Sequence, residues 1–188
     1  MIEGRYTRIA ILLHWLIAIL ILANLALPTL WENFAPDDAV RPLINLHKSF
    51  GISVFGLAAM RLLWRVTHTP PPFPEDYKRW ETRLAHVVHI SLYLFMFMVP
   101  LAGWIMDSAW KDAAKNPIVF YGAIPFPRLA PVMNLDPVTK LSVHNLFELL
   151  HGLLAYILLA LIVLHIAGAV KHQWIDRRRE IQRMWFRR

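Results

Sequence analysis

Long apolar stretches alternate with polar segments along the whole chain. Four stretches are long enough, at about 1.5 Å of helix per residue, to cross a ~30 Å hydrocarbon core. The pattern predicts transmembrane helices over about residues 9–30, 43–64, 84–106 and 141–173. We therefore expect an all-α membrane protein in which residues 1–188 form one membrane domain, a four-transmembrane-helix bundle.

Proline-rich or charged segments separate these spans. TPPPFPEDYKRWE lies between the second and third spans, and a longer segment with five prolines lies between the third and fourth. The first span follows Arg5 and Arg8 and resembles a secretory signal, but its length and His14 favour a retained helix. Residues 174–188 form a basic tail with interleaved apolar side chains. Two interpretations of this tail remain open, an amphipathic helix on the membrane surface or a frayed terminus.

Composition supports a membrane protein and excludes several other classes. The chain is 57% hydrophobic and 18% charged, with a mean hydropathy of +0.42, which is typical of a polytopic membrane protein. It has no cysteine, which excludes disulfides, thiolate-ligated iron–sulfur clusters and covalently attached c-type haem. The net charge of +7 does not indicate nucleic-acid binding, because the basic residues flank apolar spans.

The distribution of basic residues predicts the orientation. Of the 20 Lys and Arg residues, 14 fall on the face that carries both termini and the second loop. Because cytoplasmic segments are enriched in Lys and Arg, both termini should be cytoplasmic in a bacterial inner membrane, with the third loop outside. The other face carries the remaining six, Arg41, Lys48, Lys111, Lys115, Arg128 and Lys140.

Histidines recur inside the apolar spans at two depths. His151 and His165 are 14 residues apart, so they face nearly the same way and lie about 21 Å apart along the fourth helix. With the predicted topology, His14 can meet His165 in the inner half of the membrane, and His47 can meet His151 in the outer half. Imidazole inside a bilayer is costly and usually marks a relay or a bound cofactor.

Two imidazole pairs at two depths predict two non-covalent b-type haems. A low-spin haem iron takes two axial ligands, so His14, His47, His151 and His165 are the candidate iron ligands. Arg61 lies 14 residues after His47 and could pair with a haem propionate or simply extend to the headgroups. Small residues that would allow a flat porphyrin to approach follow three of these histidines, at Gly51, Gly152 and Gly168.

The remaining histidines suggest other roles. His86 and His89 open the third helix at i, i+3 spacing and are candidates for a quinone pocket near the inner haem. Either could also replace His14 as the inner ligand. His68 should be solvated, His172 interfacial, and His144 close to the outer surface.

These motifs together resemble the bacterial cytochrome b561 family. The matching segments are LLHW with His14, LHKSFGI with His47, RLLWR with Arg61, HVVH with His86 and His89, and the His151/His165 spacing followed by AVKHQWID. The chain is also similar to the cytochrome b subunits of formate dehydrogenases and nickel–iron hydrogenases. The resemblance implies a di-haem cytochrome that exchanges electrons with ubiquinone, and one type in the family oxidises superoxide on the periplasmic side.

The leading prediction is therefore electron transfer between a periplasmic-side donor and membrane ubiquinone, with superoxide as one candidate donor. The first outer loop, WENFAPDDAVR, is acidic, which does not favour an anionic donor. An electron-transfer subunit that docks on a larger dehydrogenase is an alternative. A histidine-based transporter is a further alternative, although Glu148 is the one acidic residue well within a span.

Overall fold

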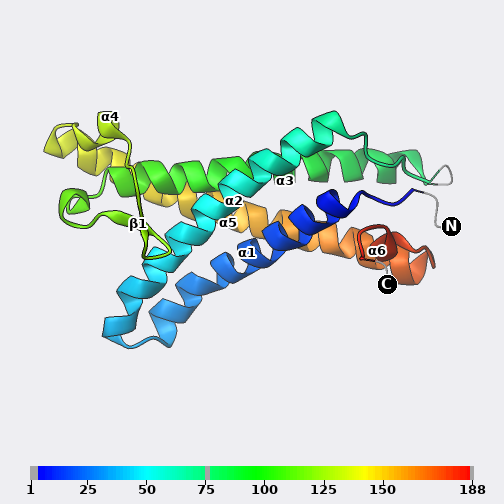
Figure 1. Cartoon of the computed structure of the whole chain (residues 1–188), viewed down its shortest axis with the longest axis horizontal. Coiled ribbons are helices and arrows are strands. Elements are labelled where there is room, and N and C mark those ends of the chain that lie inside the picture. The colour runs from blue at the N-terminus through cyan, green and yellow to red at the C-terminus, as the bar shows by residue number, and fades with distance from the viewer. Residues whose placement is uncertain (1–3, 75–76, 187–188) are drawn as a thin grey trace.

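The computed structural model describes residues 4–74 and 77–186, and four long helices dominate this part of the chain (Figure 1). They are α1 (Arg8–Asn33), α2 (Asp37–Thr67), α3 (Arg79–Ser108) and α5 (Pro137–Val170). All four are long and apolar enough to cross a membrane, which confirms the predicted all-α, four-helix membrane fold. The first three helices extend a few residues beyond both ends of their apolar stretches, because polar residues continue them outside the hydrocarbon region. The fourth begins four residues before the predicted 141–173 and ends at Val170, where a π-helical turn follows.

The helices pack mainly as two pairs, α1 with α2 and α3 with α5. The first and last described residues lie at the same end of the bundle, which we call the terminal end (Figure 1). The opposite end, which we call the distal end, carries the α1–α2 turn and the long segment between α3 and α5. In Figure 1 the α1–α2 pair diverges from the α3–α5 pair toward the distal end.

Capping groups fix where the helices begin. The Thr7 side chain accepts a hydrogen bond from the Ala10 N–H at 3.3 Å, at the start of α1. The Asp136 carboxylate accepts from two N–H groups in the first turn of α5, both at 3.1 Å. Such side-chain acceptors satisfy backbone donors that have no partner inside the helix. These bonds fix the first turns of α1 and α5, two of the helices that carry the histidines.

The buried core lies between the two predicted histidine depths. Its residues come from all four long helices and are Ile17, Ile21, Val54, Ala58, Met96 and Leu158. Leu158 lies midway between His151 and His165 on α5. Many other large apolar side chains, such as Leu12, Ile19 and Leu149, are exposed, as expected of a surface that faces lipid. The core therefore separates two sites along the bundle axis.

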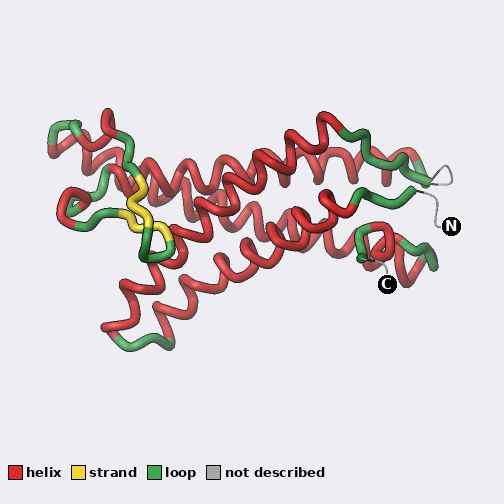
Figure 2. Tube along the Cα trace, viewed as in Figure 1, coloured by secondary structure: helices red, strands yellow, loops and turns green. Residues whose placement is uncertain are grey.

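The distal segment contains small elements that the sequence pattern did not predict. They are a 3₁₀ turn η1 (Ala113–Lys115), strands β1 (Ile118–Phe120) and β2 (Ile124–Phe126), and the short helix α4 (Ala130–Met133). The strands pair antiparallel, and Figure 2 shows them beside the helices. Gly122 has a φ of +71° in the connecting turn, where a residue without Cβ is favoured. Strands this short give too little alternation to be recognised in the sequence.

The described part of the basic tail folds back onto the bundle. After α5 the chain forms a π-helical turn, η2 (Lys171–Ile175), and then α6 (Glu180–Arg183). The buried Arg183 guanidinium donates to the carbonyls of Gly4 at 2.8 Å and Pro72 at 2.7 Å. Residues 174–186 are not a frayed terminus, because these bonds tie the tail to two other segments, and the helix in this part of the chain, α6, spans four residues. Residues 187–188 of the predicted tail lie outside the described residues.

Candidate functional site

The distal histidine pair joins α2 to α5. The ring centroids of His47 and His151 are 6.0 Å apart, and their planes are 78° from parallel. Nδ1 of His47 donates to the Asn24 carbonyl at 3.2 Å, and Nδ1 of His151 donates to the Val99 carbonyl at 3.0 Å. A neutral imidazole that donates from Nδ1 carries its lone pair on Nε2. Each ring therefore keeps Nε2 as a metal-binding nitrogen, and a backbone carbonyl fixes its orientation.

A proline makes the Asn24 carbonyl available to His47. In a regular helix this carbonyl would accept from the N–H of the residue four positions later, which here is Pro28. Proline has no N–H, so the carbonyl is left without its helical donor. His47 takes that position from the neighbouring helix. A residue whose backbone effect is local thus orients a side chain on another helix.

A glycine on α3 makes room for the His151 ring. A Cβ placed on Gly103 would lie 2.9 Å from Cε1 and 3.0 Å from Nδ1 of His151. Carbon atoms normally pack at about 3.5–4.0 Å, so any side chain here would push the ring away. Gly51 has a looser environment, in which a Cβ would come no closer than 3.8 Å to the Asn24 side chain. Within the described residues, a Cβ on Gly152 or Gly168 would meet no heavy atom inside 4 Å.

The second histidine pair lies toward the terminal end. His14 on α1 and His165 on α5 have ring centroids 6.1 Å apart, with planes 70° from parallel. His89 on α3 also approaches His165, with centroids 5.2 Å apart. The structure therefore brings His14 and His165 together, as the sequence predicts, and adds His89 as a third imidazole.

Both pairs fit one iron between two imidazoles. A metal–imidazole bond of about 2 Å and a nitrogen-to-centroid distance of about 1.1 Å place two opposed rings roughly 6 Å apart. The His47–His151 and His14–His165 distances both match this value. The neutral nitrogen donors, and the space that Gly103 leaves for one of the rings, also suit a bis-imidazole haem. The residues present therefore fit the predicted cofactor at two depths.

Arg61 lies beside the terminal pair. Its Nη1 donates to the Ala10 carbonyl at 2.6 Å, one turn before His14 on α1. It lines a cavity of about 150 Å³ together with Arg5, Thr7 and Arg65. This places cationic groups next to the histidine pair at the terminal end, where an acidic ligand group could be bound.

His86 and His89 have different surroundings although they are one helical turn apart. His86 is exposed, donates from Nδ1 to the Thr82 carbonyl at 2.7 Å, and contacts the Phe73 ring. It lines an open cavity of about 560 Å³ that also includes Tyr77. Burial, together with the nearby Glu180 carboxylate, raises the pKa of Tyr77 well above its usual range. His89 does not line this cavity; its ring lies one turn along α3, beside His165.

The other histidines have local roles in the structure. His68 stacks on Trp64 with centroids 3.6 Å apart, and His172 lies 2.7 Å from the Asp176 carboxylate. His144 donates to the Met106 carbonyl at 2.9 Å near the distal end. Each of these three histidines thus has a partner in a loop or at a helix end. The paired histidines His14, His165, His47 and His151 remain the candidate ligands.

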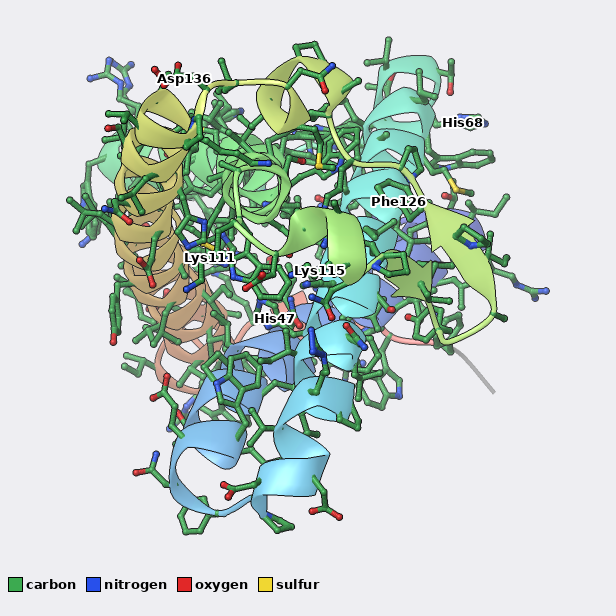
Figure 3. All side chains as sticks on the ribbon, turned by 90° about the vertical axis from the view of Figure 1, so that its left-hand side faces the viewer. His47, His68, Lys111, Lys115, Phe126 and Asp136 are labelled. Carbon is green, nitrogen blue, oxygen red and sulfur yellow. The ribbon has the colours of Figure 1, made fainter. Side chains whose placement is uncertain are left out.

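Sequence reasoning missed a charged cluster at the distal end. Lys48 lies 2.6 Å from Oδ1 of Asp107, and Nε of Arg128 donates to Oδ2 at 2.8 Å. The three residues come from α2, α3 and the segment that follows β2, and Asp107 is 8% exposed. Figure 3 looks onto this end, where Lys111 and Lys115 are labelled with His47. A lone acidic residue at the end of the third apolar span was the only sequence signal, and it did not reveal its partners.

The comparisons with known proteins agree with these observations. The family model described as prokaryotic cytochrome b561 matches residues 5–187. Cytochrome b561 homolog 2 of Escherichia coli strain K12 is 32% identical over 190 residues, covering 96% of this chain and 90% of the relative. Cytochrome b561 homolog 1 of the same strain is 24% identical over 186 residues, covering 98% of this chain and 99% of the relative.

Proposed function

Because the chain belongs to the prokaryotic cytochrome b561 family, we propose that it is a di-haem b cytochrome carrying electrons from a periplasmic donor to ubiquinone. Membership of the family makes it a haem-binding membrane electron-transfer protein. The observation that carries the finer proposal is the presence of two imidazole pairs, each separated by about the distance that one iron requires.

In this proposal His47 and His151 ligate the iron of an outer haem, and His14 and His165 ligate that of an inner haem. A b-type haem held by these side chains would supply a one-electron Fe(III)/Fe(II) couple. The carbonyls of Asn24 and Val99 hold the outer ligand rings in place and increase the basicity of their nitrogens. Four donors at two depths give the electron a route along the bundle axis.

Two observations support His14 over His89 as the inner partner of His165. The 6.1 Å centroid separation of His14 agrees with ligation through one iron, whereas 5.2 Å for His89 is shorter than that geometry needs. His14 also lies one turn from the carbonyl that binds Arg61. On our proposal this arginine donates to an inner haem propionate.

The proposed orientation places the terminal end in the cytoplasm. The N-terminal residues, the second loop and the tail carry 14 of the 20 Lys and Arg residues, as cytoplasmic segments of inner-membrane proteins do. Both termini are then cytoplasmic, and the β1–β2 segment is periplasmic. The pair His47 and His151 becomes the outer pair.

We place quinone chemistry at the cavity beside His86. Phe73 and Tyr77 provide aromatic walls, and His86 donates from Nδ1 to Thr82, which leaves Nε2 as a proton acceptor in the neutral ring. As ubiquinone is reduced it must take up protons, and this nitrogen could accept a proton from the cytoplasmic side and pass it to a quinone oxygen. His89 lies one turn deeper and contacts His165, so α3 links this cavity to the inner pair.

Charges of both signs at the distal end bear on the identity of the outer donor. Lys111 and Lys115 are exposed at the distal end, which would attract a small anion such as superoxide. Glu32, Asp37 and Asp38 are exposed around the α1–α2 turn and oppose this attraction. Docking of a larger dehydrogenase on the same end is the second candidate.

A pulse experiment with purified protein in nanodiscs tests the electron route. Superoxide is pulsed, haem reduction is followed at the α-band, and ubiquinone is then added. Reduction that slows with salt and in a Lys111→Gln/Lys115→Gln variant, followed by quinone-dependent reoxidation, would support superoxide as the donor. If no reduction exceeds spontaneous dismutation, superoxide is rejected, and stable co-purification with a soluble dehydrogenase becomes the result that supports the second candidate.

Replacement of His86 tests the acceptor side. His86→Gln should slow reoxidation by ubiquinone while the haem spectrum stays unchanged. His68→Gln is a matched control, because His68 is also an exposed histidine at this end but stacks on Trp64 instead. Equal reoxidation rates in His86→Gln and wild type would reject the cavity as the quinone site.

A further inference from the structure

Arg128 is an almost fully buried arginine with part of its guanidinium unpaired. Its side chain is 7% exposed. Nε donates to Asp107 at 2.8 Å, and Nη1 donates to the Ala113 carbonyl at 2.6 Å. Nη2 is also buried and has no hydrogen-bond partner among the described residues. A buried charged donor without an acceptor is costly, so this nitrogen is expected to have an acceptor in the loaded protein.

The cluster around Arg128 also carries a surplus positive charge. Among the described residues, Asp107 is the single carboxylate paired with Lys48 and Arg128, so one positive charge is not balanced within this group. Charges in a partly desolvated site are stable only when they are paired. An anion beside Nη2 would satisfy both the unbalanced charge and the unpaired donor.

The position of the cluster identifies the anion. Lys48 directly follows His47 on α2, and Asp107 lies one helical turn from Gly103, where an added Cβ would meet the His151 ring. Because α3 runs toward the distal end, Asp107 lies one turn to the distal side of Gly103, and Lys48 is the neighbour of His47, so the cluster borders the outer histidine pair. A haem held there would turn its charged propionates away from the hydrocarbon core and toward this end.

We propose that Arg128 donates through Nη2 to a propionate of the outer haem, with Lys48 and Asp107 holding the charge balance. This inference rests on the proposed di-haem function. It gives the segment between α3 and α5 a role in cofactor binding, which the four axial ligands alone do not suggest. The outer propionate would then have an arginine partner, as Arg61 provides on the inner side.

The loop is built to hold Arg128 in one position. The Leu129 N–H donates to Oγ of the fully buried Ser108 at 3.1 Å, and Oγ of Ser108 donates to the Trp104 carbonyl at 2.7 Å. Nε and Nη1 already attach the guanidinium to α3 and to η1. Since these bonds secure the loop, Nη2 is available for a ligand, and a preorganised donor loses little entropy on binding.

The rate of outer haem loss tests the proposal. Wild-type, Arg128→Gln and Arg128→Lys proteins are loaded with iron protoporphyrin IX or its dimethyl ester, and transfer to apomyoglobin is timed. With the free acid, Arg128→Gln should release the outer haem about tenfold to a hundredfold faster than wild type, the range of one hydrogen bond to a charged group. Arg128→Lys should lose the outer haem at an intermediate rate, because lysine keeps the positive charge but lacks the planar set of N–H donors of the guanidinium.

The dimethyl ester separates a direct contact from a structural role. Without the carboxylates, wild type and Arg128→Gln should lose the outer haem at the same rate, and the inner haem rate should not depend on Arg128. Arg41→Gln is the control, because Arg41 also attaches this segment, through Asn116. Any change that Arg41→Gln makes to the rate of outer haem loss should be the same for the free acid and the dimethyl ester.

Two results would overturn the proposal. One is an unchanged rate of outer haem loss in Arg128→Gln, and the other is a difference from wild type that persists with the dimethyl ester. If Arg128→Gln does not accumulate, the same comparison is made with Arg128→Lys. Failure of the proposed function is distinguishable, because the wild-type protein would then bind fewer than two haems before any variant is compared.

Discussion

Replacing Gly103 with alanine should disturb the outer haem site and spare the rest of the protein. The new Cβ would lie 2.9 Å from Cε1 of His151, at least about 0.6 Å inside normal packing distance. Because Gly103 is on a long helix, the ring has to move. A shift of that size would lengthen the 3.0 Å bond from Nδ1 to the Val99 carbonyl beyond hydrogen-bonding range.

The size of the effect follows from these contacts. Loss of one hydrogen bond costs about 1 kcal/mol, and disturbance of a ligand's supporting bond typically lowers metal affinity about 10- to 100-fold. Alanine in place of glycine within a helix stabilises that helix by roughly 1 kcal/mol. Gly103→Ala should therefore lose or weaken the outer haem with little change in the thermal stability of the helices.

Haem occupancy by pyridine haemochrome, a redox titration and circular dichroism measure these effects separately. Gly56→Ala is the matched control, because Gly56 lies nine residues after His47 on the opposite side of α2. Among the described residues, a Cβ on Gly56 would also meet nothing within 4 Å. Two haems with an unchanged outer midpoint potential in Gly103→Ala would refute the reasoning.

Three further substitutions test other parts of the account. Pro28→Ala restores a backbone N–H that competes for the Asn24 carbonyl, so the outer midpoint potential should become more positive while both haems remain; an unchanged potential in a redox titration argues against this bond. Arg183→Ala removes bonds to two carbonyls, so the tail should become more sensitive to protease and the melting temperature should fall, whereas wild-type resistance would mean that these bonds do not hold the tail. The Lys171 ammonium holds the pKa of Asp176 below its usual value. The ionised Asp176 carboxylate therefore adds to the free energy of unfolding above about pH 4, and this stabilisation is lost as the pH falls through the folded-state pKa. Asp176→Asn should therefore lower the melting temperature at pH 7 and approach wild type in acid, and an equal difference at both pH values would contradict the sign.

The helices and the histidine pairings could be predicted because they depend on local rules. Apolar length identifies each span, and a 14-residue spacing places His151 and His165 on one face at two depths. The charge distribution then assigns a partner to each depth, and the structure brings His14 to His165 and His47 to His151. No long-range information was needed for these pairings.

The supporting contacts could not be predicted because they depend on how the helices rotate and how loops return. Gly103 matters only because α3 presents it to His151. The contacts of Arg128 with Asp107 and of Arg183 with Gly4 join positions 21 and 179 residues apart, which no periodicity encodes. The sequence instead drew attention to Gly51, Gly152 and Gly168 because they follow histidines.

The central claim is that two imidazole pairs hold two haems, and haem counting on single histidine variants tests it most directly. The pyridine haemochrome assay should give two haems per wild-type chain. His47→Ala and His151→Ala should each disrupt the same outer haem, by loss or by conversion to a high-spin form, and His14→Ala and His165→Ala should each do so for the inner one, since a low-spin iron needs two axial ligands. One haem per fully loaded wild-type chain, or a His14→Ala protein that keeps both haems while His89→Ala loses one, would contradict the account.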